Sequence, residues 1–184
     1  MKILRGGDEL FLNKAVIRFY NSVMNEWENN GKSIALLLGC TSHKPYSTSF
    51  IHKKVIGLIQ KHELDNKVQQ FIIGEPLVIC PREWETRYPA AHYDFPPEML
   101  GEEGKKIFIM RLRDFFKKFY PRYSTFITFT PNHHRRIISA ACEGLLTPIV
   151  VSYNIYNLPR LLTVIKSCVI KDLNCFAPPP KSKR

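Results

Sequence analysis

The chain has 184 residues, enough for one domain with a hydrophobic core and too few for two domains of ordinary size. Apolar residues make up 45% and charged residues 23%, a balance typical of globular proteins and not of disordered or fibrous ones. The formal net charge of +11 favours a polyanionic partner, either a nucleic acid or an anionic membrane surface.

The five cysteines argue against secretion. An odd number in a chain of this length is not a disulfide framework, and the absence of a C-x-x-C pair removes zinc ribbons and thioredoxin-type chemistry. No run of about 18 apolar residues could span a membrane, and residues 1–8 lack the features of a secretory signal. We therefore expect a cytoplasmic protein with reduced thiols and no membrane span.

Two apolar patterns alternate along the chain. Apolar residues spaced three and four apart indicate amphipathic helices, and short continuous apolar runs indicate strands buried on both faces. In chain order, these patterns predict a helix at 11–27, a strand at 33–39, a loop at 40–49, a helix to about 61, a strand region at 68–80 with a break foreseen at 74–76, a long loop at 81–97, a helix at 103–120, a strand at 124–129, a loop at 130–134, a helix to about 144, a strand at 148–152, a helix at 158–170 and a basic, Pro-rich, disordered tail at 176–184.

Helices that alternate with buried strands predict an α/β fold: a single three-layer α/β/α domain over residues 1–175, with a mainly parallel four-stranded sheet. Ligands of such folds bind outside the carboxyl ends of the strands. This geometry selects four loops as the candidate site, at 40–49, 81–97, 130–134 and 152–157.

The first of these loops, with the helical turn after it, is dense in nucleophiles and hydrogen-bond donors: Cys40, His43, Lys44, Tyr46, Ser49 and His52. Lys44 could act as a point charge or, if desolvated, as a nucleophilic amine. The alternative is a loop of solvated side chains capped by Ser47 or Ser49, with His52 facing solvent.

A zinc site is a further alternative for this loop. Cys40 and His43 could join His133 and His134, or Cys80, around one ion. The spacing matches no zinc motif, so we predict no metal.

The loop at 81–97 combines aromatic side chains with an acid. Aromatic faces that stack a base, together with a carboxylate such as Asp94, are one way to hold a purine. In the alternative, Trp84 and Tyr88 fold back and cover the core.

The segment 105–136 is strongly basic, with nine Lys or Arg and one acid. Solvated helices normally mix charge signs, so a run of one sign favours phosphate contacts, which are salt-sensitive and independent of sequence. The predicted contacts to RNA phosphates are Lys105, Lys106, Arg111, Arg113, Lys117, Lys118, Arg135 and Arg136.

Two motifs point to a family. GCTSHKPYSTSFIH at 39–52 resembles the signature P-C-x-x-x-K-P-Y-x-x-S-x-x-H of archaeosine synthase, an archaeal tRNA-modifying enzyme and a paralogue of archaeal tRNA-guanine transglycosylase. The only departure is Gly39, where the signature has Pro. PREWETRYPAAHYD at 81–94 is similar to the family's second shared stretch, P-R-E-L…Y-P-A-A-H-Y-D.

The resemblance covers residues 30–170 and implies a fold similar to that of uracil-DNA glycosylases. Family members carry a transglycosylase-like domain before this module and a PUA RNA-binding domain after it. The chain lacks the length for either, so we expect an isolated core module that works on tRNA with a transglycosylase-like, PUA-containing or radical-SAM partner.

The resemblance also implies an activity: lysine or another amine adds to the nitrile of 7-cyano-7-deazaguanine in tRNA, and no cofactor is implied for this chain. The catalytic residues would be Cys40, which forms a thioimide, Lys44, which orients the substrate, and His52, which supplies a proton as Tyr46 also could. The substrate-binding residues would be Tyr46, Ser49, Tyr88, His92 and Asp94.

Two other functions stay open from the sequence. A non-catalytic module could hold tRNA or the modified base for a partner enzyme. A glycosylase-like enzyme acting on DNA is compatible with the fold, although fold alone does not give function.

Overall fold

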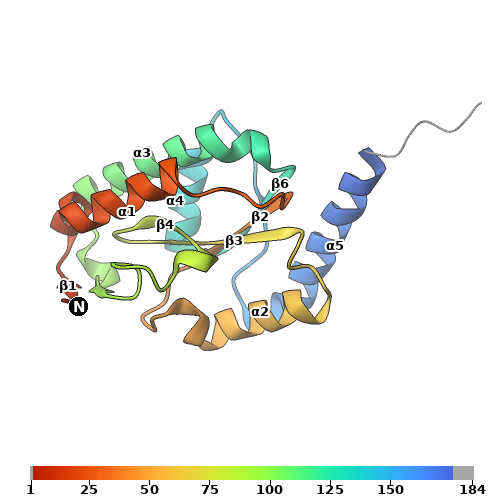
Figure 1. Ribbon diagram of the computed structural model, residues 1–184, viewed down its shortest axis with the longest axis horizontal. Coiled ribbons are helices and arrows are strands. Elements are labelled where there is room, and N and C mark those ends of the chain that lie inside the picture. The colour runs from red at the N-terminus through yellow and green to blue at the C-terminus, as the bar shows by residue number, and fades with distance from the viewer. Residues whose placement is uncertain (1, 176–184) are drawn as a thin grey trace, which may run out of the picture.

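A five-stranded sheet forms the centre of the molecule in the computed structural model, which describes residues 2–175 (Figure 1). The strand order is β4-β3-β2-β6-β7. The strands are β2 (Ile34–Gly39), β3 (Val68–Gly74), β4 (Val78–Pro81), β6 (Thr125–Phe129) and β7 (Ile149–Val150). All neighbours pair in parallel except β4, which runs antiparallel to β3. A separate parallel pair joins β1 (Leu4–Arg5) to β5 (Tyr93–Asp94).

Helices cover both faces of this sheet, as Figure 1 shows. The helices are α1 (Lys14–Asn25), α2 (Phe50–Lys61), α3 (Glu102–Phe119), α4 (Asn132–Cys142) and α5 (Leu158–Cys175). Side chains of α1, α3 and α4 form one apolar cluster with Ala35 and Leu37 of β2, and side chains of α2 and α5 form a second with Leu36 and Leu38. Because β2 is buried on both faces, its sequence is a continuous apolar run. The predicted α/β class with a mainly parallel sheet is confirmed.

The predicted strand count was wrong. Residues 68–80 do not form one strand region of a four-stranded sheet but the hairpin β3–β4, which makes five strands. Pro81, at the end of β4, pairs with Phe71 in the middle of β3. We had expected the loop 81–97 to leave from the carboxyl edge of the sheet, but β4 runs the other way and the loop leaves beside the middle of β3. The turn at 75–77 lies at that edge instead.

The described residues leave some expectations untested. The single-domain boundary at residue 175 and the likeness to uracil-DNA glycosylases stay predictions, and the tail at 176–184 lies outside the described residues. Within residues 2–175, no helix combines the length and apolarity needed to cross a membrane.

Candidate catalytic site

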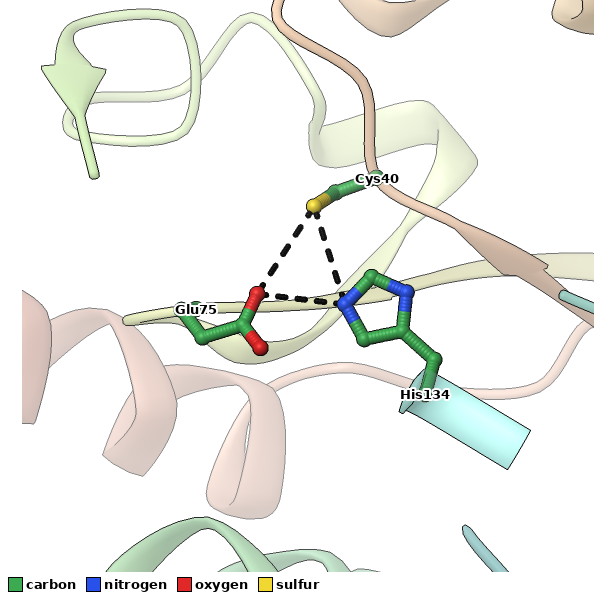
Figure 2. A group of neighbouring side chains, drawn as sticks. All are labelled: Cys40, Glu75 and His134. Atoms are coloured by element: carbon green, nitrogen blue, oxygen red, sulfur yellow. Dashed lines mark hydrogen bonds and ion pairs between the residues drawn. The ribbon is translucent and has the colours of Figure 1, made fainter. Parts of the chain in front are cut away.

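Three chain segments meet at the carboxyl edge of the sheet. Cys40 directly follows β2, Glu75 directly follows β3, and His134 lies in the first turn of α4, which follows β6. Figure 2 shows these three side chains pointing toward one another. His134 Nε2 lies 3.1 Å from Glu75 Oε2 and 3.9 Å from Cys40 Sγ, and Cys40 Sγ lies 4.0 Å from the same carboxylate oxygen. We call these three residues the Cys–Glu–His cluster.

Two glycines allow this close approach. A Cβ at Gly74 would lie 2.3 Å from Cys40 Sγ, and a Cβ at Gly39 would lie 2.4 Å from Pro131 Cδ in the segment that leads to His134. Neither distance is possible for real atoms, so larger residues at these positions would push the three segments apart.

Hydrogen bonds within the buried cluster set its charge state. Glu75 is 4% exposed and His134 is 1% exposed, whereas Cys40 is half-buried. Burial alone lowers the pKa of His134, but its hydrogen bonds to Cys40 and Glu75 outweigh burial and raise the pKa to about 9. Burial raises the pKa of Glu75, and the hydrogen bond from His134 reverses this, so the net direction is down. At neutral pH, Glu75 and His134 therefore form an imidazolium–carboxylate pair.

This arrangement places a sulfur nucleophile beside a proton donor. The imidazolium can protonate the product of an attack by that sulfur. Among the described residues, the second carboxylate oxygen of Glu75 and Nδ1 of His134 are buried without a hydrogen-bond partner. These two atoms of the cluster therefore have hydrogen-bonding capacity that no described residue uses.

The same three residues could hold a metal ion. Their ligand atoms all lie within 4.8 Å of one another, and sulfur, imidazole nitrogen and carboxylate oxygen are the ligand types of zinc. Of the zinc ligands considered from the sequence, this group contains Cys40 and His134, whereas His43 is exposed and Cys80 is buried elsewhere in the core.

Lys44 lies beside the cluster on an aromatic surface. Its Nζ is 4.0 Å from the centre of the Tyr93 ring, and the hydroxyl groups of Tyr46 and Tyr93 are 2.7 Å apart. Burial lowers the pKa of Lys44, while the charges of Cys40 and Asp94 act in the opposite direction. The predicted meeting of the loops 40–49 and 81–97 is thus present, through this pair of tyrosines.

His52 holds the loop 40–49 in place. It is 2% exposed, so it does not face solvent. Its Nε2 donates to the carbonyl of Gly39 (2.9 Å), and its Nδ1 accepts from the Arg82 guanidinium (2.5 Å). Burial and then the charge of Arg82 lower the pKa of His52 to about 4, so its ring is neutral at pH 7.

The far end of the loop is anchored to the same guanidinium. Arg82 also pairs with Glu85 (2.9 Å), whose carboxylate accepts from the backbone N–H of Ser47 (2.9 Å). Ser49 precedes α2, but its side chain makes no capping hydrogen bond, and its buried hydroxyl has no partner among the described residues. Capping by Ser49, which was one alternative, is therefore wrong.

The remaining predicted substrate-binding residues lie around the second loop. Tyr88 is 37% exposed, and its ring centre lies 5.8 Å from that of His92. Asp94 is exposed on β5, next to Tyr93. Trp84 does fold back onto the core, as the alternative had it, whereas Tyr88 does not.

Much of the basic segment makes contacts within the protein. Lys105 and Lys106 pair with Glu102 and Glu103 at 2.7 Å. Arg111 donates to the carbonyl of Phe11, Arg113 to those of Ala141 and Glu143, and Lys118 to that of Met24, while Lys117 lies 3.9 Å from Asp114.

Arg135 and Arg136 differ from these residues. Both are exposed on α4, and within residues 2–175 their side chains make no hydrogen bond or ion pair. Of the eight predicted phosphate contacts, these two therefore have charged groups without a partner among the described residues.

Sequence reasoning missed Glu75 and Tyr153, and it considered His134 only as a zinc ligand. Gly74-Glu75-Pro76 was read as a break in a strand, and a charged residue inside an apolar run was the available signal for Glu75. Tyr153 packs on Phe129 with ring centres 5.2 Å apart, and burial and then the charge of Cys40 raise its pKa.

Comparisons with known proteins place the chain in a family. The model of a domain of unknown function, DUF5591, matches residues 16–157. The chain belongs to the DUF5591 family. The match contains every residue of the Cys–Glu–His cluster.

Two curated relatives of this DUF5591 chain are named archaeosine synthase subunit alpha. The protein from Thermoplasma acidophilum is 33% identical over 152 residues, which are 82% of this chain and 28% of the relative. The protein from Methanosarcina acetivorans is 31% identical over 168 residues, covering 86% of this chain and 26% of the relative. The chain thus spans about a quarter of the length of these relatives.

One solved structure shares the fold. The crystal structure of AF0587, a protein of unknown function, matches with a TM-score of 0.58 and 22% identity, covering 80% of this chain and 49% of that one. At this identity the likeness shows the fold alone.

Proposed function

We propose that this chain acts in the synthesis of archaeosine in tRNA, by helping an amine such as lysine to add to the nitrile of 7-cyano-7-deazaguanine. The observation that carries the proposal is the Cys–Glu–His cluster, which lies within the segment shared with the archaeosine synthase relatives. A nitrile carbon requires a nucleophile, and its nitrogen requires a proton. The half-buried thiol and the buried imidazolium match these two requirements.

In the first step Cys40 attacks as the thiolate, after its thiol proton has passed to solvent, and its Sγ forms a bond with the nitrile carbon. One π bond of the C≡N group breaks, its electron pair moves to nitrogen, and that nitrogen takes the proton of His134. The product is a thioimidate, and His134 is left neutral. Glu75 holds the imidazole in place and favours its charged form before the attack.

The second step transfers the carbon to the amine. The amine nitrogen attacks the thioimidate carbon, the C–S bond breaks, and the thiolate leaves. One amine proton returns to His134, so the product is an amidine and the cluster is restored. Lys44, cationic over the Tyr93 ring, would orient the carboxylate of the incoming lysine.

This assignment changes the proton donor expected from the sequence. His52 and Tyr46 were the candidates, but both ring nitrogens of His52 have partners and the Tyr46 hydroxyl is bonded to Tyr93. His134 instead has its charged nitrogen beside Cys40. We propose that His52 positions the loop and that Tyr46, with Ser49, shapes it.

We propose that tRNA and a second protein chain take part. Two relatives are named as subunits, which supports a partner. A transglycosylase-like, PUA-containing or radical-SAM chain would supply the tRNA-binding surface or complete the product. The base itself would rest near Tyr88, His92 and Asp94.

The experiment is a mass measurement of the intact protein after incubation with tRNA that carries the cyano base. A thioimidate adduct should form in the wild type and in Cys168→Ala, a control on α5, but not in Cys40→Ala. Labelled lysine, added with each candidate partner, should then appear in the tRNA. A folded protein that forms no adduct and transfers no lysine with any partner would refute the chemistry. If tRNA affinity also survives Cys40→Ala and Lys44→Ala, the chain is a non-catalytic binding module.

A further inference from the structure

A groove runs along α4 on the side of the sheet's last strand. Its volume is about 820 Å³, within the range of sites that hold small ligands. Arg135, Arg136 and Ser139 of α4 line one wall, and Thr147 and Val150 lie on the other. The proposed chemistry does not use this groove.

The groove shares α4 with the Cys–Glu–His cluster. His134 is followed directly in α4 by Arg135 and Arg136, so one helix carries both the proposed proton donor and the groove wall. The two guanidinium groups lie in the first half of α4, and the acid of the lining, Glu143, lies beyond the helix's other end. The positive end of the groove is therefore the end closest to His134 along α4.

The lining suits a single strand of nucleic acid better than a duplex. Leu146 contributes apolar surface to the lining, and Val150 of the edge strand β7 is 44% exposed. Burial of apolar surface against the face of an unpaired base is favourable, whereas a duplex keeps those faces stacked inside. Free arginines at a groove rim suit the phosphates of the same strand.

We propose that this groove receives unpaired nucleotides that flank the target base in the RNA substrate. The inference rests on the proposed function, because an enzyme that does chemistry on a base must take it out of its stack, which also unstacks its neighbours. Arg135 and Arg136 would contact the phosphates nearest the base, and the apolar lining would take one or two neighbouring bases.

The test measures binding, without lysine and without chemistry. Fluorescence anisotropy would compare a short single-stranded RNA with the same RNA in a duplex. Arg135→Ala/Arg136→Ala should weaken single-strand binding roughly tenfold and lower the salt dependence of log K by about 1.4, for two lost phosphate contacts. The matched control, Lys166→Ala/Lys171→Ala, removes the same charge from exposed sites on α5 and should change neither value appreciably.

A second variant tests the groove without changing charge. Ser139→Trp fills it from the exposed side of α4 and should also weaken single-strand binding, with circular dichroism confirming the fold. Equal losses in the groove and α5 variants, a duplex that binds as tightly as the single strand, or full affinity in Ser139→Trp would each overturn the proposal. Groove variants that keep RNA affinity but lose a partner polypeptide would assign the groove to protein. Loss of lysine transfer with groove-dependent binding intact would refute only the chemistry.

Discussion

Replacing Glu75 by Gln removes one negative charge 3.1 Å from His134 Nε2 and keeps the size of the side chain. In the wild type, burial lowers the pKa of His134, and the hydrogen bonds to Cys40 and Glu75 raise it to about 9 from the ordinary 6.5. That difference corresponds to roughly 3 kcal/mol in favour of the imidazolium. Without the carboxylate, burial acts with less opposition, so the pKa of His134 should fall toward the ordinary 6.5.

The protonation state of His134 determines how fast the proposed thioimidate can form. With pKa values of about 9 and 6.5, the His134 ring is about 90% charged in the wild type and about 3% charged in Glu75→Gln at pH 8, so thioimidate formation should slow roughly 30-fold. Side-chain NMR gives the pKa of His134, and timed mass measurements give the adduct rate. Glu98→Gln, at an exposed carboxylate, is the control. A pKa that stays near 9 in Glu75→Gln, or a wild-type value near 6.5, would show that the pair does not control the proton.

The other predictions concern packing and stability. Gly74→Ala puts a methyl group 2.3 Å from Cys40 Sγ, so adduct formation should slow at least tenfold. That loss corresponds to raising the activation free energy by roughly 1.4 kcal/mol. The control Gly57→Ala, in open space on α2, should keep full activity and gain about 0.5–1 kcal/mol of stability in urea unfolding. His52 has a folded pKa of about 4 against an ordinary 6.5, so the unfolded chain takes up the proton first as the pH falls. Wild-type stability should therefore drop between pH 6.5 and 4, by on the order of 3 kcal/mol, and His52→Gln should lack this component.

Most of the fold could be predicted because the helices and parallel strands have simple apolar patterns. The error lay in residues 68–81, where β3 and β4 are buried along their whole length. A hairpin that faces water on one side alternates apolar and polar residues, but this hairpin is covered on both faces and shows no alternation. Because no alternating apolar pattern marks two separate strands, the turn at Glu75 was interpreted as a break within one strand region.

The candidate site could be predicted only in part, since its members come from three segments. Cys40 was found because it directly follows a buried strand and lies in a recognisable motif. Glu75 and His134 lie 35 and 94 residues further along and meet Cys40 only through the sheet order β3-β2-β6. Single-sequence patterns do not give strand order, so the proton donor was sought within the motif itself.

The basic segment shows a related limit. Its charges were counted from the sequence, but Arg111 and Arg113 donate to backbone carbonyls that join α3 to its neighbours. A guanidinium group with a long apolar stem can serve packing as well as ligand binding. Counting charges therefore found the right region and overstated the number of free cations in it.

The motif at 40–52 has two kinds of residue, and the structure explains why both are needed. A loop that is drawn into the interior must satisfy its polar groups there, since an unpaired buried polar group costs about 1–3 kcal/mol. His52 and the Arg82–Glu85 pair do this for the carbonyl of Gly39 and the N–H of Ser47. The sulfur of Cys40 is left half-buried against the imidazole of His134. Dense polarity in a short loop can thus come largely from anchoring, with only Cys40 and Lys44 of this motif facing the proposed reaction.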